Sequence, residues 1–414
     1  MTRVNKVIVV CGAALGLTCG FGPMFFSVVG IFLKPMAMSF HWGRSDVAIL
    51  PMLAMTGTAV GAPIVGLIAD RIGWRKVIAY AIFLFSLSLV ALAMAPASRA
   101  YVGIAGFAIG LTGAATTAAG YLAVLPRVFD ARLGMALGFG MIGTGIGGFI
   151  APIAANRLGA ITDWRHAYMV FAIVALTLGF LAHQLIFRNL PKSAPVSANS
   201  QVSDDGEAMQ GEAGMLLSEA FVGYRFWLIA VAVFLVSSVI LGGFVHLAAF
   251  VSDKGLSTEV AARAAAVVGL GLAVARVGLG VLLDRVFAPL VAMVAFAMGA
   301  LGFLIFVTDA VQVPTFLLLG ALLLGIATGS EGDLIPYLTR KYFGKRAIGA
   351  IYGSLFGAAT IGGAVGPYLY GLAFDHFGSY TPIHQISGIA CVVCAVAILF
   401  LGRYPRSFSG VGNV

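Results

Sequence analysis

Charged residues are scarce in this 414-residue sequence, and their scarcity excludes a soluble globular domain. Asp, Glu, Lys and Arg together make up 10% of the residues, whereas hydrophobic residues make up 60%. Soluble domains usually carry about 25% charged residues. The composition therefore predicts an integral membrane protein embedded in a lipid bilayer.

Clusters of reactive side chains are lacking as well, which argues against an enzyme. His, Cys and Asp residues nowhere show the spacing of metal ligands, and the sequence has neither a phosphate-binding loop nor a hydrolase constellation. The four cysteines fall in apolar runs, where cysteine is usually a small packing residue. We therefore predict no enzymatic activity, no cofactor and no metal.

Long apolar runs are abundant, and their length indicates helices. A helix that crosses a hydrocarbon core of about 30 Å needs roughly 20 residues, whereas a barrel strand needs about 10. The sequence therefore predicts an all-α membrane fold with 12 transmembrane helices, over residues 7–33, 44–69, 76–95, 99–126, 132–155, 166–188, 225–251, 258–284, 287–308, 313–339, 346–372 and 381–401.

One long polar segment, residues 189–220, divides these spans into two sets of six. The segment is rich in Ser, Ala, Gly and acidic residues, and it has too little apolar surface to fold alone. We expect an N-terminal six-helix bundle over residues 1–188, a cytoplasmic linker over 189–220, and a C-terminal six-helix bundle over 221–414. Because one chain already contains both bundles, we expect a monomer.

The two halves repeat each other's sequence. The string GLIADR at Gly66–Arg71 recurs as GVLLDR at Gly280–Arg285, and GGFIAP at Gly147–Pro152 recurs as GGAVGP at Gly362–Pro367. Parallel repeats of this kind are typical of transporters whose halves rock about a substrate site near the middle of the membrane.

Lys and Arg are distributed unevenly between the two sides of the predicted membrane. The side that holds the N-terminus has 17 of the 25 basic residues, the opposite side has 7, and Arg276 falls inside a span. The positive-inside rule then places both termini in the cytoplasm, and we expect a protein of the bacterial inner membrane. The basic residues are scattered over short loops, so the net charge of +9 does not indicate nucleic-acid binding.

The string GLIADRIGWRK after the second span resembles the signature loop of the major facilitator superfamily, whose fold has two six-helix halves. The resemblance extends over the whole chain. Asp70 and Asp284 end the second and eighth spans, where they can pair with the neighbouring Arg71, Arg75 and Arg285 across the half in one conformational state. We expect these residues to form a conformational latch that does not contact substrate.

Four further strings together resemble the monocarboxylate transporter and oxalate/formate antiporter branch: GIFLKPMAMSFHWGRSDV, RLGMALGFGMIGTGIGG, DWRHAY and GLAVARVGLGVLLDR. This resemblance implies a small organic anion as substrate. It also implies that Arg276 contacts the substrate carboxylate, as the matching arginine of the eighth helix does in that branch. The chain departs from the branch at Leu272, where some members have aspartate, and at Phe25 and Phe26, where some have lysine.

Away from the ends of the predicted spans, three charged residues remain: Arg276, Glu331 and Asp333. An ionisable side chain at the centre of a membrane helix costs about 2.5–3.5 kcal/mol on insertion scales, so it is usually paired or faces water. Arg276 and Glu331 each lie 5 residues past the middle of their spans, which places both roughly 7 Å from the midplane. Asp333 is turned about 200° around the helix from Glu331, so the two carboxylates point to different faces.

Two roles are open for these acids. In the first, Glu331 or Asp333 pairs with Arg276 while substrate is absent, and proton uptake releases the arginine to bind the substrate carboxylate. In the second, the acids bond backbone or hydroxyl groups and hold a bend in a helix that glycines and Pro336 interrupt.

Several other side chains could line the substrate cavity or could simply pack in the core. Hydroxyl groups could bond a carboxylate and phenyl rings could form an apolar wall; the candidates are Tyr121, Tyr337, Thr117, Phe25 and Phe26. His246, near the outer end of the seventh span, could sense pH or could be a buried structural residue.

These observations together predict a secondary transporter that carries a small organic anion, a mono- or dicarboxylate, by alternating access with proton symport. Carboxylate exchange is an alternative that uses the same residues. Export of lipophilic compounds is a further alternative. The glycine-rich fifth span favours it, whereas Arg276 argues against it because a cation in the site repels cationic drugs. A non-transporting membrane sensor would need a soluble output domain, which the linker does not supply.

Overall fold

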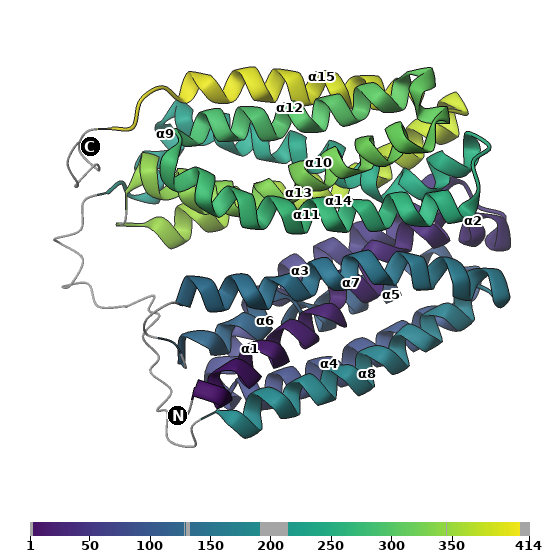
Figure 1. Cartoon of the computed structure of the whole chain (residues 1–414), viewed down its shortest axis with the longest axis horizontal. Helices are drawn as coiled ribbons and strands as arrows, with labels where there is room; N and C mark the ends of the chain where they lie inside the picture. The colour runs from purple at the N-terminus through teal and green to yellow at the C-terminus, as the bar shows by residue number, and fades with distance from the viewer. Residues whose placement is uncertain (1–2, 128, 130–132, 191–213, 345, 406–414) are drawn as a thin grey trace.

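The structure is a computed structural model that describes residues 3–127, 129, 133–190, 214–344 and 346–405. These residues are almost entirely helical, and within them no β-strand is formed. The long helices lie in two groups, with the first six predicted spans in one group and the last six in the other (Figure 1). The predicted all-α fold is confirmed.

The first group is the purple-to-teal part of Figure 1. In chain order it contains α1 (Arg3–Thr18), the π-helical turn η1 (Gly22–Phe26), α2 (Ser27–Phe40), α3 (Arg44–Ile72), α4 (Trp74–Ala93), α5 (Arg99–Gly113), the 3-10 turn η2 (Ala114–Thr116), α6 (Ala118–Tyr121), the 3-10 turn η3 (Leu122–Arg127), α7 (Leu133–Ile161) and α8 (Trp164–Asn189).

The second group is the green-to-yellow part of the same view. It contains α9 (Leu217–Val222), α10 (Tyr224–Asp253), α11 (Thr258–Arg285), α12 (Ala288–Val307), the 3-10 turn η4 (Asp309–Gln312), α13 (Pro314–Phe343), α14 (Ile348–Phe377), α15 (Thr381–Ala397) and the 3-10 turn η5 (Ile398–Leu401). Most of the predicted linker, residues 191–213, lies outside the described residues. Its last part includes α9, which packs against α10 and α14.

Eleven helical segments in the described part of the chain are long and apolar enough to cross a membrane. They correspond to all the predicted spans except 346–372, which is covered by the glycine-rich α14. With 30 residues, α14 is about 45 Å long, more than a bilayer core requires. It also packs along α3 and α10. The structure therefore agrees with the predicted twelve-helix fold.

The first and fourth spans are each broken near the middle, which the apolar runs did not predict. The first span passes from α1 through η1 to α2, and the fourth passes from α5 through η2 and η3. The two breaks meet: the backbone N–H of Phe21 donates to Thr116 Oγ1 at 3.0 Å, and that hydroxyl donates to the carbonyl of Gly113 at 2.8 Å. A broken helix is stable inside a membrane when its freed backbone groups find partners of this kind.

The two groups contact each other mainly along α3 with α14, α7 with α11, and α2 with α10. The contact is tight at the end of the molecule away from the termini, which we call the far end. A Cβ built on Gly371 would lie 2.6 Å from Ser45 Cα, and one built on Gly30 would lie 2.3 Å from the carbonyl oxygen of Val245. Only glycine allows this approach, because any side chain would overlap the opposite backbone.

The groups diverge toward the end where the termini lie, which we call the termini end (Figure 1). Gly66 of α3 lies about three helical turns beyond Met55, which contacts α14. Gly353 of α14 lies about five turns before Gly371. Each glycine therefore faces the opposite group, yet a Cβ built on either one would have no described atom within 4 Å. In the described chain the two groups are thus in close contact at the far end, whereas α3 and α14 are apart at Gly66 and Gly353 near the termini end.

Candidate functional site

Glycines bring α11 and α13 into direct backbone contact within the second group. A Cβ built on Gly325 would lie 2.2 Å from the carbonyl oxygen of Val268, and one built on Gly329 would lie 2.7 Å from that of Leu272. Neither position has room for a larger residue. Glycines four residues apart on one face are a common way of packing membrane helices closely.

The close approach places the guanidinium group of Arg276 on α11 directly beside Gly332 on α13. A Cβ built on Gly332 would lie 3.0 Å from Arg276 Nη2 and 3.3 Å from Arg276 Cζ. Arg276 is therefore level with the segment Glu331–Asp333, as the depth comparison predicted. The absence of a side chain at Gly332 leaves the space that the guanidinium occupies.

Glu331 points from α13 toward α10. Its Oε1 accepts a hydrogen bond from the hydroxyl of Ser237, and Ser237 is only 1% exposed. Sequence reasoning missed Ser237, although two adjacent serines in the apolar seventh span were a signal. The side chain of Asp333 lies outside the described residues, so the choice between the two acids stays open.

The predicted interruption of this helix is wrong. Helix α13 runs continuously from Pro314 to Phe343, and Pro336 lies inside it. Gly329 does not break the helix but contacts the backbone of α11. The close contact between α13 and α11, and not a break in α13, explains why position 329 is a glycine.

Two of the other predicted substrate contacts lie in the core of the first group. Tyr121 is buried, and its ring lies against Gly16 of α1, within a cluster built from the first group alone. Phe25 is fully buried, with its ring centroid 5.6 Å from that of Phe21 and 6.4 Å from that of Tyr168. These placements favour packing roles.

The remaining candidates are more accessible. The hydroxyl of Thr117 donates to the carbonyl of Ala114 at 2.7 Å and caps α6, so it stabilises the break in the fourth span. Phe26 reaches the second group, with its ring 5.9 Å from that of Phe244 on α10. Tyr337 is partly buried on α13, and Lys341 Nζ lies 5.6 Å from its ring centroid.

His246 has partners for both ring nitrogens. It is fully buried, with Nδ1 2.7 Å from the hydroxyl of Tyr380 and Nε2 2.8 Å from the carbonyl oxygen of Pro367. The arrangement agrees with the structural reading of this histidine.

The arginines of the predicted latch lie at the termini end, where the groups diverge. Arg71 and Arg75 flank the turn between α3 and α4, Arg285 ends α11, and all three are exposed. The side chains of Asp70 and Asp284 lie outside the described residues. The latch therefore stays a prediction about another conformational state.

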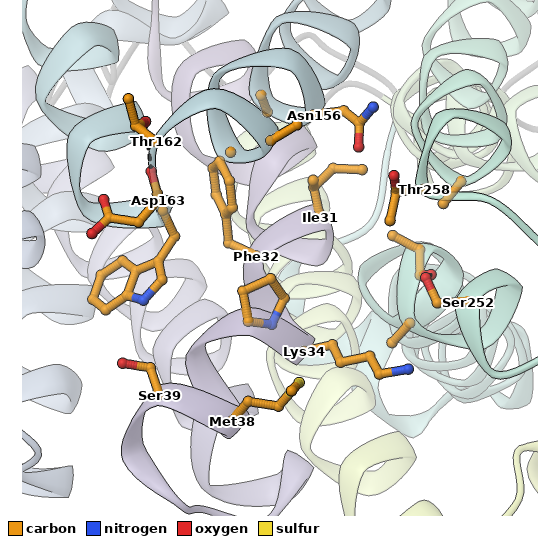
Figure 2. A pocket seen from close by; sticks show the side chains of 18 of the residues that line it. Ile31, Phe32, Lys34, Met38, Ser39, Asn156, Thr162, Asp163, Ser252 and Thr258 are labelled. Atoms are coloured by element: carbon orange, nitrogen blue, oxygen red, sulfur yellow. Dashed lines mark hydrogen bonds between the residues drawn. The ribbon is translucent and has the colours of Figure 1, made fainter.

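A pocket of about 730 Å³ lies at the far end, between α2, α7 and α8 of the first group and α10 and α11 of the second. Figure 2 shows Thr162 and Asp163 on one side of it, Ser252 and Thr258 on the other, and Phe32 between them. Asp163 is the N-cap of α8, and its carboxylate accepts hydrogen bonds from the backbone N–H of His166 at 2.8 Å and from the ring nitrogen of the same residue. The backbone hydrogen bond is the main reason that the pKa of Asp163 lies below its ordinary value.

A family model described as Major Facilitator Superfamily matches residues 15–311. The chain belongs to the major facilitator superfamily. Members of this superfamily are membrane transporters, so the prediction that the chain is not an enzyme is confirmed.

Related transporters of this superfamily match most of the chain. Human monocarboxylate transporter 11 is 26% identical over 412 residues, which cover 98% of this chain and 84% of that protein. The gallate transporter of Pseudomonas putida is 29% identical over 388 residues, which cover 82% of this chain and 83% of that protein. The predicted resemblance to the monocarboxylate transporter branch is confirmed by these relatives.

Solved structures of superfamily transporters share the fold. The nucleoside transporter NupG aligns with a TM-score of 0.76 and 13% identity, over 96% of this chain and 100% of that one. A bacterial homologue of the human lysosomal transporter Spinster, in an inward-facing and unoccupied conformation, aligns with a TM-score of 0.65 and 17% identity, over 97% of this chain and 96% of that one. At this level of identity the likeness concerns the fold alone.

Proposed function

We propose that the chain is a secondary transporter of a small organic anion, a mono- or dicarboxylate, and that it works by alternating access with proton symport. The observation that carries the proposal is the placement of the Arg276 guanidinium beside Gly332, the residue that separates Glu331 from Asp333 in the sequence of α13. The names of the relatives, a monocarboxylate transporter and a gallate transporter, support the same substrate class.

Arginine suits this role because its planar guanidinium donates two parallel hydrogen bonds to a carboxylate. The guanidinium packs against Gly332, a position that has no side chain of its own. A substrate carboxylate then takes the place of a carboxylate of the protein, and the charge of Arg276 is neutralised in both states of the cycle. An intramembrane cation without such a partner would be costly.

Proton coupling follows from the two acids that flank Gly332. In the proposed cycle, Glu331 or Asp333 takes up a proton and no longer competes for Arg276, so proton and substrate are bound together. Ser237 supports the part of Glu331, because its hydroxyl donates a hydrogen bond to this carboxylate and fixes its position between α13 and α10. After substrate and proton have left, the ionised acid pairs with Arg276 again, and the empty transporter returns to its starting conformation.

The two groups of helices act as the rocking halves, residues 1–188 and 221–414, joined by a linker over 189–220. The distribution of Lys and Arg favours a cytoplasmic termini end, so the described conformation is open to the cytoplasm. The latch of Asp70, Arg71, Arg75, Asp284 and Arg285 would then form when this end closes. We place the monomeric carrier in the bacterial inner membrane.

A screen of labelled carboxylates tests the substrate class. The protein is reconstituted in proteoliposomes, and uptake of lactate, oxalate and gallate is measured with and without an imposed pH gradient. Proton symport predicts uphill uptake driven by an inwardly directed proton gradient. Exchange predicts uptake only into vesicles preloaded with a carboxylate, and no uptake of any carboxylate in either format would refute the proposal.

Arg276→Lys tests the binding role. A lysine keeps the charge but loses the paired donors, so we expect the apparent KM for the carboxylate to rise about tenfold or more. Arg263→Lys is the matched control, because Arg263 is exposed on the same helix and pairs with Glu259 at 2.5 Å. Equal KM values for Arg276→Lys and Arg263→Lys would show that Arg276 does not hold the carboxylate.

Glu331→Gln and Asp333→Asn test the proton role. Replacement of the coupling acid abolishes the dependence of uptake on the pH gradient but leaves carboxylate exchange, because the amide keeps the shape without the titration. Glu259→Gln, on exposed α11 surface, is the control. If the double variant Glu331→Gln/Asp333→Asn still accumulates substrate uphill with the wild-type response to the gradient, neither acid carries the proton.

A further inference from the structure

Asp375 of the second group caps a helix of the first group at the far end. Helix α3 begins after Gly43, which has no side chain to cap it. The carboxylate of Asp375 on α14 accepts the backbone N–H of Arg44 at 2.9 Å and that of Ser45 at 2.9 Å, and the Ser45 hydroxyl at 2.5 Å. The orphan N–H groups and positive end of α3 are thus satisfied by a residue more than 300 positions away, across the boundary between the groups.

The side chain of Arg44 crosses the same boundary. Its guanidinium donates to Oδ1 of Asp253 on α10 at 2.8 Å and to the hydroxyl of Tyr380 at 2.8 Å, and its Nη1 forms an ion pair with Oδ2 of Asp253 at 2.5 Å. Its Cζ lies 3.6 Å from the ring centroid of Phe374. Arg44 is only 8% exposed, so its guanidinium is largely sheltered from water.

One partner of Arg44, the hydroxyl of Tyr380, is held in place by residues of the second group alone. The carbonyl of Pro367 can only accept, so His246 carries its proton on Nε2 when neutral, and its Nδ1 accepts from the hydroxyl of Tyr380. The hydroxyl oxygen of Tyr380 is then oriented to accept from Arg44. These buried hydrogen bonds, from the carbonyl of Pro367 through His246 to Tyr380, fix the hydroxyl of Tyr380 as an acceptor for the guanidinium of Arg44.

We propose that Arg44 and Asp375 fasten the far end as a gate, and that both must release before the transporter opens there. The contacts join α3 to α10, α14 and the start of α15, and they lie where the two groups touch most closely. Lys34 adds a second cation on Asp253 at 3.0 Å. At the termini end, no described atom lies within 4 Å of a Cβ built on Gly66 or Gly353. In this proposal the far-end network therefore sets the balance between the two open states.

The proposal rests on the alternating-access part of the proposed function but not on the identity of the substrate. Its test therefore measures distances between spin labels, without substrate, in the full-length protein in lipid nanodiscs. The exposed Cys11 is first replaced by serine, while Cys19, Cys391 and Cys394 are buried. A failure to find a transported carboxylate leaves this measurement intact.

Two pairs of labelled cysteines report the two ends of the molecule. Met38 on α2 and Phe377 on α14, which are 68% and 59% exposed, report the far end. Ile72 on α3 and Phe356 on α14 are exposed and report the termini end. A rocking motion lengthens the first distance and shortens the second together, whereas local fraying changes the first alone.

We expect Arg44→Ala to raise the ratio of far-open to far-closed molecules about tenfold or more, since charge-assisted hydrogen bonds are lost from the closed state alone. Asp375→Ala should raise the same ratio. Because Asp375 is exposed, this variant should fold, and it provides the test if Arg44→Ala folds poorly. Arg99→Ala is the matched control, because Arg99 pairs at the far end with Asp46 of its own group at 2.8 Å.

Opposite changes in the two distances in Arg44→Ala and Asp375→Ala, with Arg99→Ala like wild type, support the gate. Wild-type distances in both variants would overturn it. A longer far-end distance with no change at the termini end would also overturn it, because the residues would then stabilise only the local structure.

Discussion

Replacing Gly332 with alanine should separate the folding of the second group from substrate binding. The added Cβ would lie 3.0 Å from Arg276 Nη2 and 3.3 Å from both Cζ and Nη1, whereas ordinary contacts begin at 3.4 Å. The atoms in the way are the far end of a long, flexible side chain, which can move. Alanine also favours a helix by about 1 kcal/mol over glycine, so we expect the stability of Gly332→Ala to stay close to that of wild type.

The effect on binding should be larger than the effect on folding. The guanidinium must retreat by about 0.4 Å or more to restore ordinary contacts, and a pair of parallel hydrogen bonds does not survive a sideways shift unchanged. The loss of one charge-assisted hydrogen bond weakens binding by about 1.5 kcal/mol, which corresponds to about a tenfold rise in apparent KM.

The assay combines the concentration dependence of carboxylate uptake in proteoliposomes with thermal unfolding in detergent. Gly278→Ala is the control without contacts, because no described atom lies within 4 Å of a Cβ at that position of α11. Gly329→Ala is the opposite control: its Cβ would meet the backbone of Leu272 at 2.7 Å, so it should lower the stability by about 1–3 kcal/mol. An unchanged KM in Gly332→Ala would refute the assignment of substrate binding to the guanidinium at this position.

Two further predictions concern residues of the first group. Tyr121→Phe should transport with wild-type KM, because Tyr121 packs against α1 in the core; a rise in KM would restore it as a substrate contact. Asp163→Ala removes the cap of α8 and should lower stability by about 1 kcal/mol at neutral pH. Because the pKa of Asp163 in the folded chain lies below the ordinary 3.8, this stabilisation is present above pH 3.8 and is lost as the pH falls below it. The melting temperatures of wild type and Asp163→Ala should therefore converge in acid, and a constant difference down to pH 3 would contradict this account.

The spans were predictable because the bilayer imposes a length and a polarity on every helix that crosses it. The predicted span 381–401 agrees with α15 and η5, and the span 99–126 covers α5 through η3. The breaks in the first and fourth spans were not predictable in this way, since hydropathy does not report backbone geometry. They depend on Thr116, whose hydroxyl meets Phe21 only after the two spans have packed together.

The site was predictable in part for a similar reason. Charge inside an apolar span is rare and is visible in the sequence, so Arg276 and Glu331 could be found and set at one depth. Their surroundings were not visible, since Ser237 is one of many hydroxyl residues in the chain and Gly332 one of 54 glycines. The far-end network was missed because Arg44, Asp253 and Asp375 lie at or just beyond the ends of the predicted spans, where charged residues are ordinary.

The sequence alone determined that the protein is a membrane-embedded bundle of twelve helices in two repeated halves, because periodicity, hydropathy and repetition are properties of the chain itself. Only the tertiary structure decided which glycines contact another helix, which hydroxyl serves Glu331, and which end of the molecule is closed. These features depend on atoms brought together from distant positions, such as Asp375 on the start of α3 and Arg276 beside Gly332. Such contacts have no signature in local composition, because each partner is selected by the packing of the helices.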